Sequence, residues 1–171
     1  VSGVCVDMGR PLFSAHEIPV RTYGEGPVVE CELTVDTREL TFTAVSMGNP
    51  HVIIEVDDLN QTPWQELGPK IEHHPAFPHK TNVHFVQRLD SDRLQVKVWE
   101  RGAGPTLACG TGACAVVAAL SLTGRIDRRA QVLLPGGDLL IEWKQDDHIY
   151  MTGPATQVFE GTFHPSWDWN L

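Results

Sequence analysis

Alternating hydrophobic and polar positions dominate the chain and predict extended structure. The segments 28–35 and 93–99 alternate with a period of two residues, which is typical of strands with one buried face. Turn residues at 90–92 and at 135–138 indicate hairpin connections between neighbouring strands. Shorter apolar runs predict the remaining strands, at 40–45, 51–56, 82–89, 131–134, 139–143 and 149–151.

The segment 63–73 has the pattern of a first helix. Thr62 is a suitable N-cap residue, Pro63 suits the first helical position, and Gln65 completes a capping box. Gly68 and Pro69 lie inside this segment and oppose regular helical structure there.

A second helix is predicted over 112–123, ending before Gly124. Ser121 and Thr123 are its polar side chains, so it is apolar on all sides and must be buried on all sides. About 12 residues are too few to cross a membrane. We therefore predict an α+β fold, in which a curved and mostly antiparallel sheet wraps round one central helix within a single domain, residues 1–171.

Composition narrows the class of protein. The chain has 171 residues and a formal net charge of −9, which argues against binding to nucleic acid. It contains neither a membrane-length apolar stretch nor the pattern of a signal peptide, and we expect a cytoplasmic protein. Four cysteines without a CxxC pair are too few for a disulfide framework, so free thiols are expected.

The glycine-rich segment 100–115 connects a predicted strand to the apolar helix. Free backbone N–H groups and the positive end of the helix dipole meet there, which favours an anion and predicts a lowered pKa for Cys109. One interpretation is a tight turn with a buried cysteine. A second is dinucleotide binding, because 110–115 fits GxGxxA, but that motif requires a parallel βαβ unit. A third is an acid/base or nucleophilic cysteine beside a carboxylate-binding nest.

The same segment resembles the second catalytic signature of the diaminopimelate epimerases. It reads Glu-Arg-Gly-x-Gly-x-Thr-x-Ala-Cys-Gly-Thr-Gly-Ala-Cys-Ala. Shorter motifs similar to those of this family occur in the same order along nearly the whole chain, at 6–11, 45–51, 77–78, 81–86 and 158–161.

The resemblance implies an epimerase that interconverts LL- and meso-diaminopimelate without pyridoxal phosphate or a metal. In this family two cysteines face the substrate α-carbon from opposite sides, one removing a proton and the other donating one. Cys109 is similar to the second of these cysteines. Gly110 and Thr111 resemble the nest that holds the reacting carboxylate of the substrate.

The resemblance also implies roles for five polar residues. Glu100 and Arg101 resemble substrate contacts, with Glu100 also tuning Cys109, although a solvated ion pair is the alternative. Asn49 and Asn82 resemble substrate contacts, and His51 resembles a residue that tunes the cysteine pair. Ordinary turn chemistry around Pro50 and the start of a strand are the alternatives for these three.

No metal site is expected. The histidines at 73, 74, 79 and 84 cluster in sequence, but they lack a helical i, i+4 pair or a carboxylate partner.

The chain departs from the family in one large respect. The first catalytic cysteine of the family lies in a Cys-Gly-Asn-Gly motif that this sequence does not contain. The chain therefore resembles the C-terminal lobe of a two-lobe enzyme and is expected to be inactive alone. The resemblance also implies that strands near 4–8 and 158–163 join the sheet of the first lobe.

Several partners and functions remain open from the sequence. The expected partners are diaminopimelate, a first lobe in the same or a separate chain, and a second copy of this chain in a homodimer. Alternative functions are a related racemase, such as a proline racemase or a phenazine-pathway isomerase, or a non-catalytic subunit that pairs with a first-lobe polypeptide.

Overall fold

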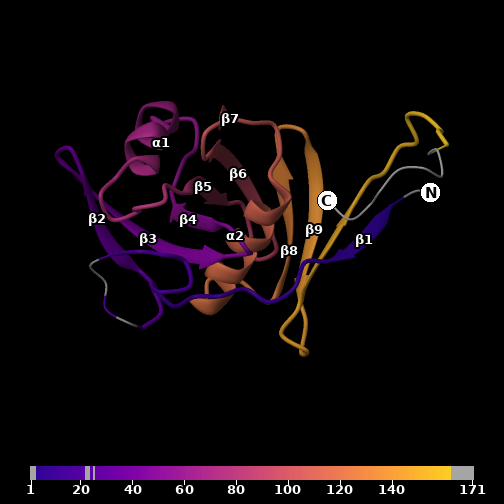
Figure 1. Ribbon diagram of the computed structural model, residues 1–171, viewed down its shortest axis with the longest axis horizontal. Helices are drawn as coiled ribbons and strands as arrows, with labels where there is room; N and C mark the ends of the chain where they lie inside the picture. The colour runs from indigo at the N-terminus through magenta and orange to yellow at the C-terminus, as the bar shows by residue number, and fades with distance from the viewer. Residues whose placement is uncertain (1–2, 22–23, 25, 163–171) are drawn as a thin grey trace.

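The computed structural model describes residues 3–21, 24 and 26–162 (Figure 1). In this part of the chain ten strands and two helices follow in the order β1 Val4–Asp7, β2 Cys31–Val35, β3 Arg38–Ser46, β4 Pro50–Glu55, α1 Trp64–Glu72, β5 Asn82–Arg88, β6 Arg93–Glu100, β7 Gly104–Pro105, α2 Gly110–Leu122, β8 Arg129–Leu134, β9 Gly137–Trp143 and β10 Ile149–Gly153.

The strands form one sheet in the order β1-β10-β9-β8-β6-β5-β4-β3-β2, and β7 pairs with β6 beside this path. Two neighbouring pairs are parallel, β4 with β5 and β6 with β8, and the others are antiparallel. Parallel neighbours need a crossover connection, and α1 and α2 supply one each. The predicted α+β fold with a mostly antiparallel sheet is therefore confirmed.

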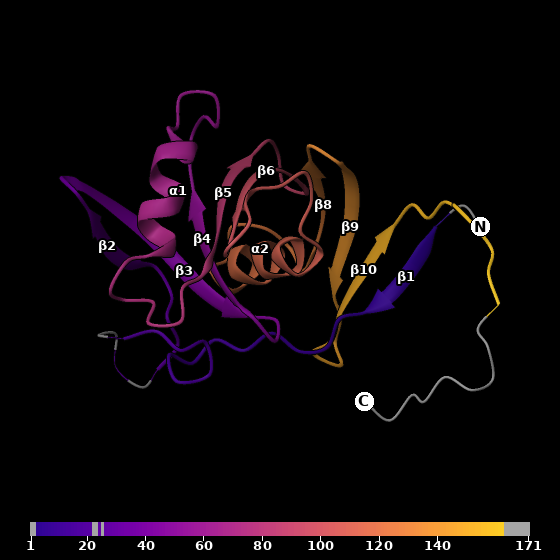
Figure 2. The same cartoon turned by 45° about the horizontal axis from the view of Figure 1, so that its top comes forward.

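Helix α2 lies inside the bend of the sheet, and Figure 2 shows it between β4 and β5 on one side and β8 and β9 on the other. Residues 112–120 of this helix are all buried. It contacts β3, β4 and β5 on one side and β8, β9 and β10 on the other. A helix without a polar face can be accommodated only in this way, which confirms the prediction of a central buried helix.

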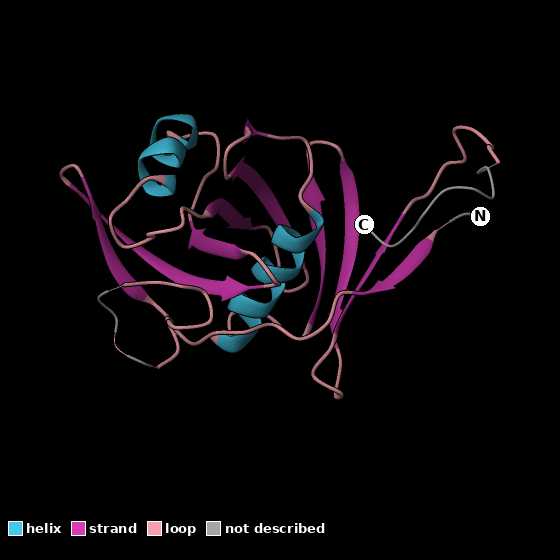
Figure 3. Ribbon diagram, in the orientation of Figure 1, coloured by secondary structure: helices cyan, strands magenta, loops and turns pink. Residues whose placement is uncertain are grey.

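A second apolar core lies on the other face of β3, β4 and β5 and was not predicted. Leu67 and Ile71 of α1 pack there against strand residues such as Phe42 and Phe85. The segment between β1 and β2 also contributes the buried side chains of Ala15, Ile18, Val20 and Val28 to this core. Figure 3 shows the two helices apart from each other, and the strands that separate them are therefore buried on both faces.

Several predicted element ends are wrong. The first helix begins at Trp64 without a side-chain cap, because the Thr62 hydroxyl donates to the Asp58 carbonyl (2.7 Å). The predicted strand 28–35 is shortened to β2 because Glu30 has φ 47°, a left-handed conformation that interrupts extended structure. The second helix begins two residues earlier than predicted, at Gly110, which makes Cys109 its N-cap residue.

The first strand has a partner within this chain, and its joining the sheet of a first lobe stays a prediction. β1 pairs in antiparallel fashion with β10, from Val4 opposite Gly153 to Asp7 opposite Tyr150, so it belongs to the sheet of this chain. Residues 158–162 form no strand, and the predicted strand end at 163 lies outside the described residues.

Candidate active site

Three strand ends and the start of α2 meet at one place. His51 begins the pairing of β4 with β5 opposite Asn82, and the Val83–Trp99 pair places the end of β6 beside them. Side chains alternate along a strand, so His51, Asn82 and Glu100 point to the sheet face that α2 covers. The sheet therefore brings together residues that lie 49 positions apart at most, from 51 to 100.

Cys109 is the residue that connects this place to α2. Its backbone is extended (φ −140°, ψ 105°), and the first intrahelical bond runs from the Ala113 N–H to the Cys109 carbonyl (2.9 Å). The amides of Gly110 and Thr111 therefore have no acceptor within the helix and are available to an anion. The Cys109 side chain is buried, with 7% of the residue exposed.

Burial raises the pKa of the Cys109 thiol, contrary to the lowering predicted from its place at a helix N-terminus. The Thr111 hydroxyl and the Gly112 amide act in the opposite direction but are outweighed. The Glu100 carboxylate adds to the upward shift, because a second negative charge nearby opposes formation of the thiolate. Cys109 is therefore held as a thiol at neutral pH.

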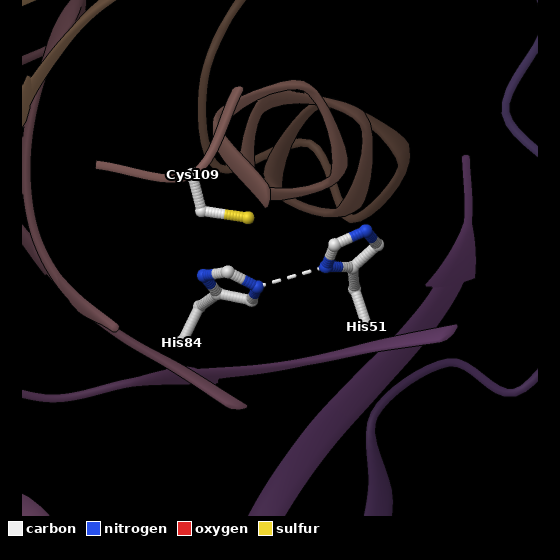
Figure 4. Close-up of side chains that lie close together, drawn as sticks. All are labelled: His51, His84 and Cys109. Atoms are coloured by element: carbon white, nitrogen blue, oxygen red, sulfur yellow. Dashed lines mark hydrogen bonds between the residues drawn. The ribbon is translucent and has the colours of Figure 1, made fainter. Parts of the chain in front are cut away.

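Two buried histidines lie close to Cys109, with His84 below it in the view of Figure 4 and His51 beside His84. His51 Nδ1 and His84 Nε2 are 2.9 Å apart, and His51 Nε2 is 2.9 Å from Asn49 Oδ1. Burial lowers the pKa of His84 to about 3, and it lowers the pKa of His51 well below its usual range, helped by His84 and Arg101. Both rings are therefore neutral at physiological pH.

His51, His84 and Cys109 also form a group of three possible metal ligands, with one ligand atom of each within 4.8 Å of the others. Two nitrogens on one tetrahedral zinc ion, at about 2.0–2.1 Å each, would lie roughly 3.3 Å apart. The observed 2.9 Å between the two facing nitrogens is instead the length of a hydrogen bond. In the described part of the chain, the histidines at 73, 74 and 79 belong to no such group.

A second set of contacts leads from Asn49 to the cysteine. Asn49 Nδ2 lies 3.5 Å from Thr111 Oγ1, and Thr111 Oγ1 lies 3.7 Å from Cys109 Sγ. These three residues come from the turn before β4, the first turn of α2 and its N-cap. The predicted site residues Asn49, His51, Thr111 and Cys109 are thus in one continuous cluster.

The buried Asn82 and the exposed Arg101 lie beside this cluster. The Asn82 side chain donates to the Pro50 carbonyl (2.8 Å) and accepts from the Arg101 N–H (2.9 Å), so both its polar ends hold backbone. The exposed Arg101 guanidinium donates to the His79 carbonyl (3.1 Å). The Glu100 carboxylate accepts from the Thr106 hydroxyl (2.5 Å), which ties the end of β6 to the loop before Cys109.

Glu72 holds the turn that follows β6, and the sequence analysis did not predict this role. Its buried carboxylate accepts from the Trp99 indole (2.8 Å) and from the Gly102 N–H (3.0 Å). Asn82 and Glu72 thereby hold the consecutive amides of Arg101 and Gly102. A glutamate at the end of a predicted helix gave no sequence signal for this contact across 30 residues.

His84 is the other residue that sequence reasoning passed over. The alternation of β5 would have found it, because Asn82, His84 and Val86 share one face of that strand. A polar ring in the middle of an apolar strand, on the face that meets the buried helix, is a signal for a buried functional group.

Comparison with known proteins places this site in a family. A family model described as diaminopimelate epimerase matches residues 43–158, which is more than half of the chain. The chain belongs to the diaminopimelate epimerase family. The resemblance drawn from the motifs at 45–51 and 100–115 is thereby confirmed.

Curated relatives agree with this assignment. The diaminopimelate epimerase of Desulfitobacterium hafniense is 56% identical over 94% of this chain, and that of Heliobacterium modesticaldum is also 56% identical over 94%. These matches cover 56% and 57% of those two proteins, so the chain spans about half the length of the curated relatives it matches.

A likeness of fold extends beyond the family. The structure of a hydroxyproline epimerase from Agrobacterium vitis aligns with a TM-score of 0.62, over 90% of this chain and 50% of that one, at 16% identity. In the part of the chain that the structure describes, neither helix is long and apolar enough to span a membrane.

Proposed function

We propose that this chain is the C-terminal lobe of an amino-acid epimerase that acts on diaminopimelate, with Cys109 as one of two acid/base groups. The observation that carries the proposal is Cys109 at the N-cap of α2, between free helix amides and the polar cluster of Asn49 and Thr111. The 56% identity to diaminopimelate epimerases supports this substrate rather than proline.

The geometry suits removal of a proton from a carbon atom beside a carboxylate. Such a C–H is a very weak acid, and the negative charge that develops needs preorganised donors in a dry site. The amides of Gly110 and Thr111 would hold the reacting carboxylate. The Cys109 thiolate takes the α-proton in one direction, and in the other direction the thiol gives its proton to the α-carbon.

The raised pKa of Cys109 is compatible with this role. A buried thiol is a competent proton donor to the α-carbon. In the other direction Cys109 acts as the base in its thiolate form, while the second group of the pair carries a proton. Glu100, Arg101, Asn49 and Asn82 would bind the rest of the substrate, and His51 with Glu100 would tune the cysteine. No pyridoxal phosphate or metal is needed for this chemistry.

The second acid/base group would come from a first lobe, in the same polypeptide or in a separate one. The sheet offers a surface for it, because β1 is the end strand and its Val4 and Val6 are 44% and 42% exposed. Leu107, in the loop before Cys109, is 70% exposed. Exposed apolar residues on an edge strand favour pairing with another polypeptide. We expect the chain to be inactive without that lobe.

Deuterium uptake at Cα of LL-diaminopimelate in D₂O tests the proposal. The chain is assayed alone and with a polypeptide that carries the first lobe of the Desulfitobacterium hafniense relative. We expect exchange only with both parts, and a loss of about 10²–10⁴-fold in Cys109→Ala, the usual contribution of a positioned acid or base. Cys31→Ala is the matched control, because Cys31 lies on β2, at the opposite end of the sheet from β1.

Two results would reject this function. If both folded parts together give no exchange, the chain is not a lobe of this epimerase, and a non-catalytic subunit becomes the better explanation. If Cys109→Ala exchanges as fast as the parent chain, another residue removes the proton. Exchange of proline but not of diaminopimelate would instead indicate a related racemase.

A further inference from the structure

His84 is a buried side chain of the candidate site for which the proposed function gives no role. It is fully buried, and among the described residues its Nδ1 is the buried side-chain atom that has no hydrogen-bond partner. Its ring lies against the first turn of α2, where a Cβ on Gly112 would meet His84 Cε1 at 2.1 Å. Glycine is less favourable in a helix than alanine. The first turn of α2 therefore loses some stability, and the glycine there leaves room for the His84 ring.

The hydrogen-bond direction around His51 follows from its neighbours. A neutral imidazole has one donor and one acceptor. Asn49 Oδ1 only accepts, so His51 Nε2 carries the proton and donates to it. His51 Nδ1 must then accept, and the donor 2.9 Å away is His84 Nε2.

A proton on His84 Nε2 also explains why His84 Nδ1 has no hydrogen-bond partner. With its proton on Nε2, Nδ1 is a bare lone pair rather than an N–H. A buried N–H without an acceptor is rarer in proteins than an acceptor left unused. The opposite direction would place a proton on His84 Nδ1, where the described structure offers no acceptor.

The chain of donors continues toward the cysteine. Asn49 uses Oδ1 to accept from His51, which leaves its Nδ2 to donate to Thr111 Oγ1. A hydroxyl that accepts from Asn49 keeps its own proton for the next contact, and Cys109 Sγ is 3.7 Å away. A hydrogen bond donated to sulfur favours the thiolate over the thiol.

We propose that His84 is a positioning residue that sets the direction of one hydrogen-bond chain, His84 to His51 to Asn49 to Thr111, so that the Thr111 hydroxyl donates to Cys109. This inference rests on the proposed function only for its catalytic consequence. The hydrogen-bond chain itself is a property of the free protein.

Glu100, Cys114 and Arg101 are further charged or titratable groups near Cys109 and this hydrogen-bond chain. Glu100 from β6 disfavours the thiolate, and Cys114 lies farther along α2 with burial raising its own pKa to about 12. His84 and His51 are both neutral, and Arg101 affects His51 from the end of β6. A change at His84 therefore alters Cys109 through hydrogen bonds and not through a change of charge.

The test follows the pH dependence of Cys109 alkylation by iodoacetamide, measured by peptide mass spectrometry in the full chain. His84→Leu removes the donor to His51, whereas His84→Gln keeps an N–H at the position of Nε2. We expect the alkylation midpoint to move to higher pH in His84→Leu and to stay at the parent value in His84→Gln. Thr111→Val should move it in the same direction as His84→Leu, because it removes the last donor.

Nitrogen NMR of the unsubstituted chain gives a readout that needs no variant to fold. We expect His51 and His84 both in the neutral form with the proton on Nε2. A proton on Nδ1 of either ring would overturn the direction of the chain. An unchanged alkylation midpoint in folded His84→Leu would overturn the influence of His84 on Cys109.

The catalytic consequence is read separately, in the deuterium assay with both lobes. We expect kcat to fall about 10²-fold in His84→Leu, as small misplacements near reacting groups do, with KM little changed and activity restored in His84→Gln. If the parent protein gives no exchange, the proposed function fails, and the NMR and alkylation results still decide whether the hydrogen-bond chain exists.

Discussion

At the scale of single residues, the site is held by side chains that accept from backbone amides. Glu72 is the clearest case, because its two oxygens accept from the Trp99 indole and the Gly102 N–H at the turn that carries Arg101. Burial by itself raises the pKa of Glu72, but these bonds, with His73 and Lys80 nearby, lower it below its ordinary value. The ionised carboxylate is therefore the form that supports the turn.

Glu72→Gln should destabilise the chain by about 1–3 kcal/mol at pH 7, because the amide can accept from only one of the two donors. A lowered pKa in the folded state means stability that is present above the unfolded pKa and lost as pH falls through the folded one. The difference between the two proteins in urea unfolding should thus shrink below about pH 4. Glu66→Gln, at an exposed ion pair with Lys70, is the control and should cost no more than about 0.5 kcal/mol. Equal costs at pH 7 would refute the role of Glu72.

Sequence reasoning at this scale succeeded where residues share a motif and failed where they meet only in space. Asn49 and His51 are two positions apart and were predicted together. Glu72 reaches the site through a bond across 30 residues, which no local pattern contains. The alternation of β5 places His84 on the face that α2 covers, but it does not show that this ring meets His51. The pKa of Cys109 was predicted in the wrong direction because a sequence shows the helix N-terminus but not the burial that outweighs it.

At the scale of elements, the apolar helix α2 was predictable and the contacts of α1 were not. A helix without a polar face leaves no alternative to burial on all sides. The packing of α1 on β6 depends on Gly68. In the sequence this glycine indicates only a weak point in a helix. In the structure a Cβ on Gly68 would lie 2.7 Å from Trp99 Cγ, so the absence of a side chain is what lets α1 sit on β6.

Gly68→Ala therefore has two opposing effects. Alanine favours the helix by about 1 kcal/mol, but overpacking against the half-buried ring of Trp99 costs about 1–3 kcal/mol. We expect a net loss of stability of up to about 2 kcal/mol in urea unfolding, with a change in the fluorescence of Trp99. Gln65→Ala, exposed on the same helix, should change stability by less than about 0.5 kcal/mol. A gain in stability from Gly68→Ala would mean that α1 moves freely away from Trp99.

At the scale of the whole molecule, one sheet separates two cores. Val52 and Ile54 of β4 face α1, and Ile53 between them faces α2. The same alternation holds in β5, where Val83 and Phe85 face one core and Val86 the other. Runs of consecutive apolar residues in these strands were the available sequence signal for burial on both faces, and they were interpreted only as strands.

Because β3, β4 and β5 supply side chains to both cores, damage to one core should weaken the other. Phe42→Ala removes a fully buried ring that packs edge-on against Phe77 in the core under α1, with ring centroids 5.7 Å apart. We expect a loss of about 3–5 kcal/mol. Amide hydrogen exchange should then speed up in α2, on the opposite face of the sheet, by the same factor as in α1.

Leu122→Ala, 43% exposed at the end of α2, is the control and should leave both helices protected. Faster exchange confined to α1 and its neighbours would mean that the two cores unfold as separate units, and the site at their shared strands would then survive the loss of the core under α1.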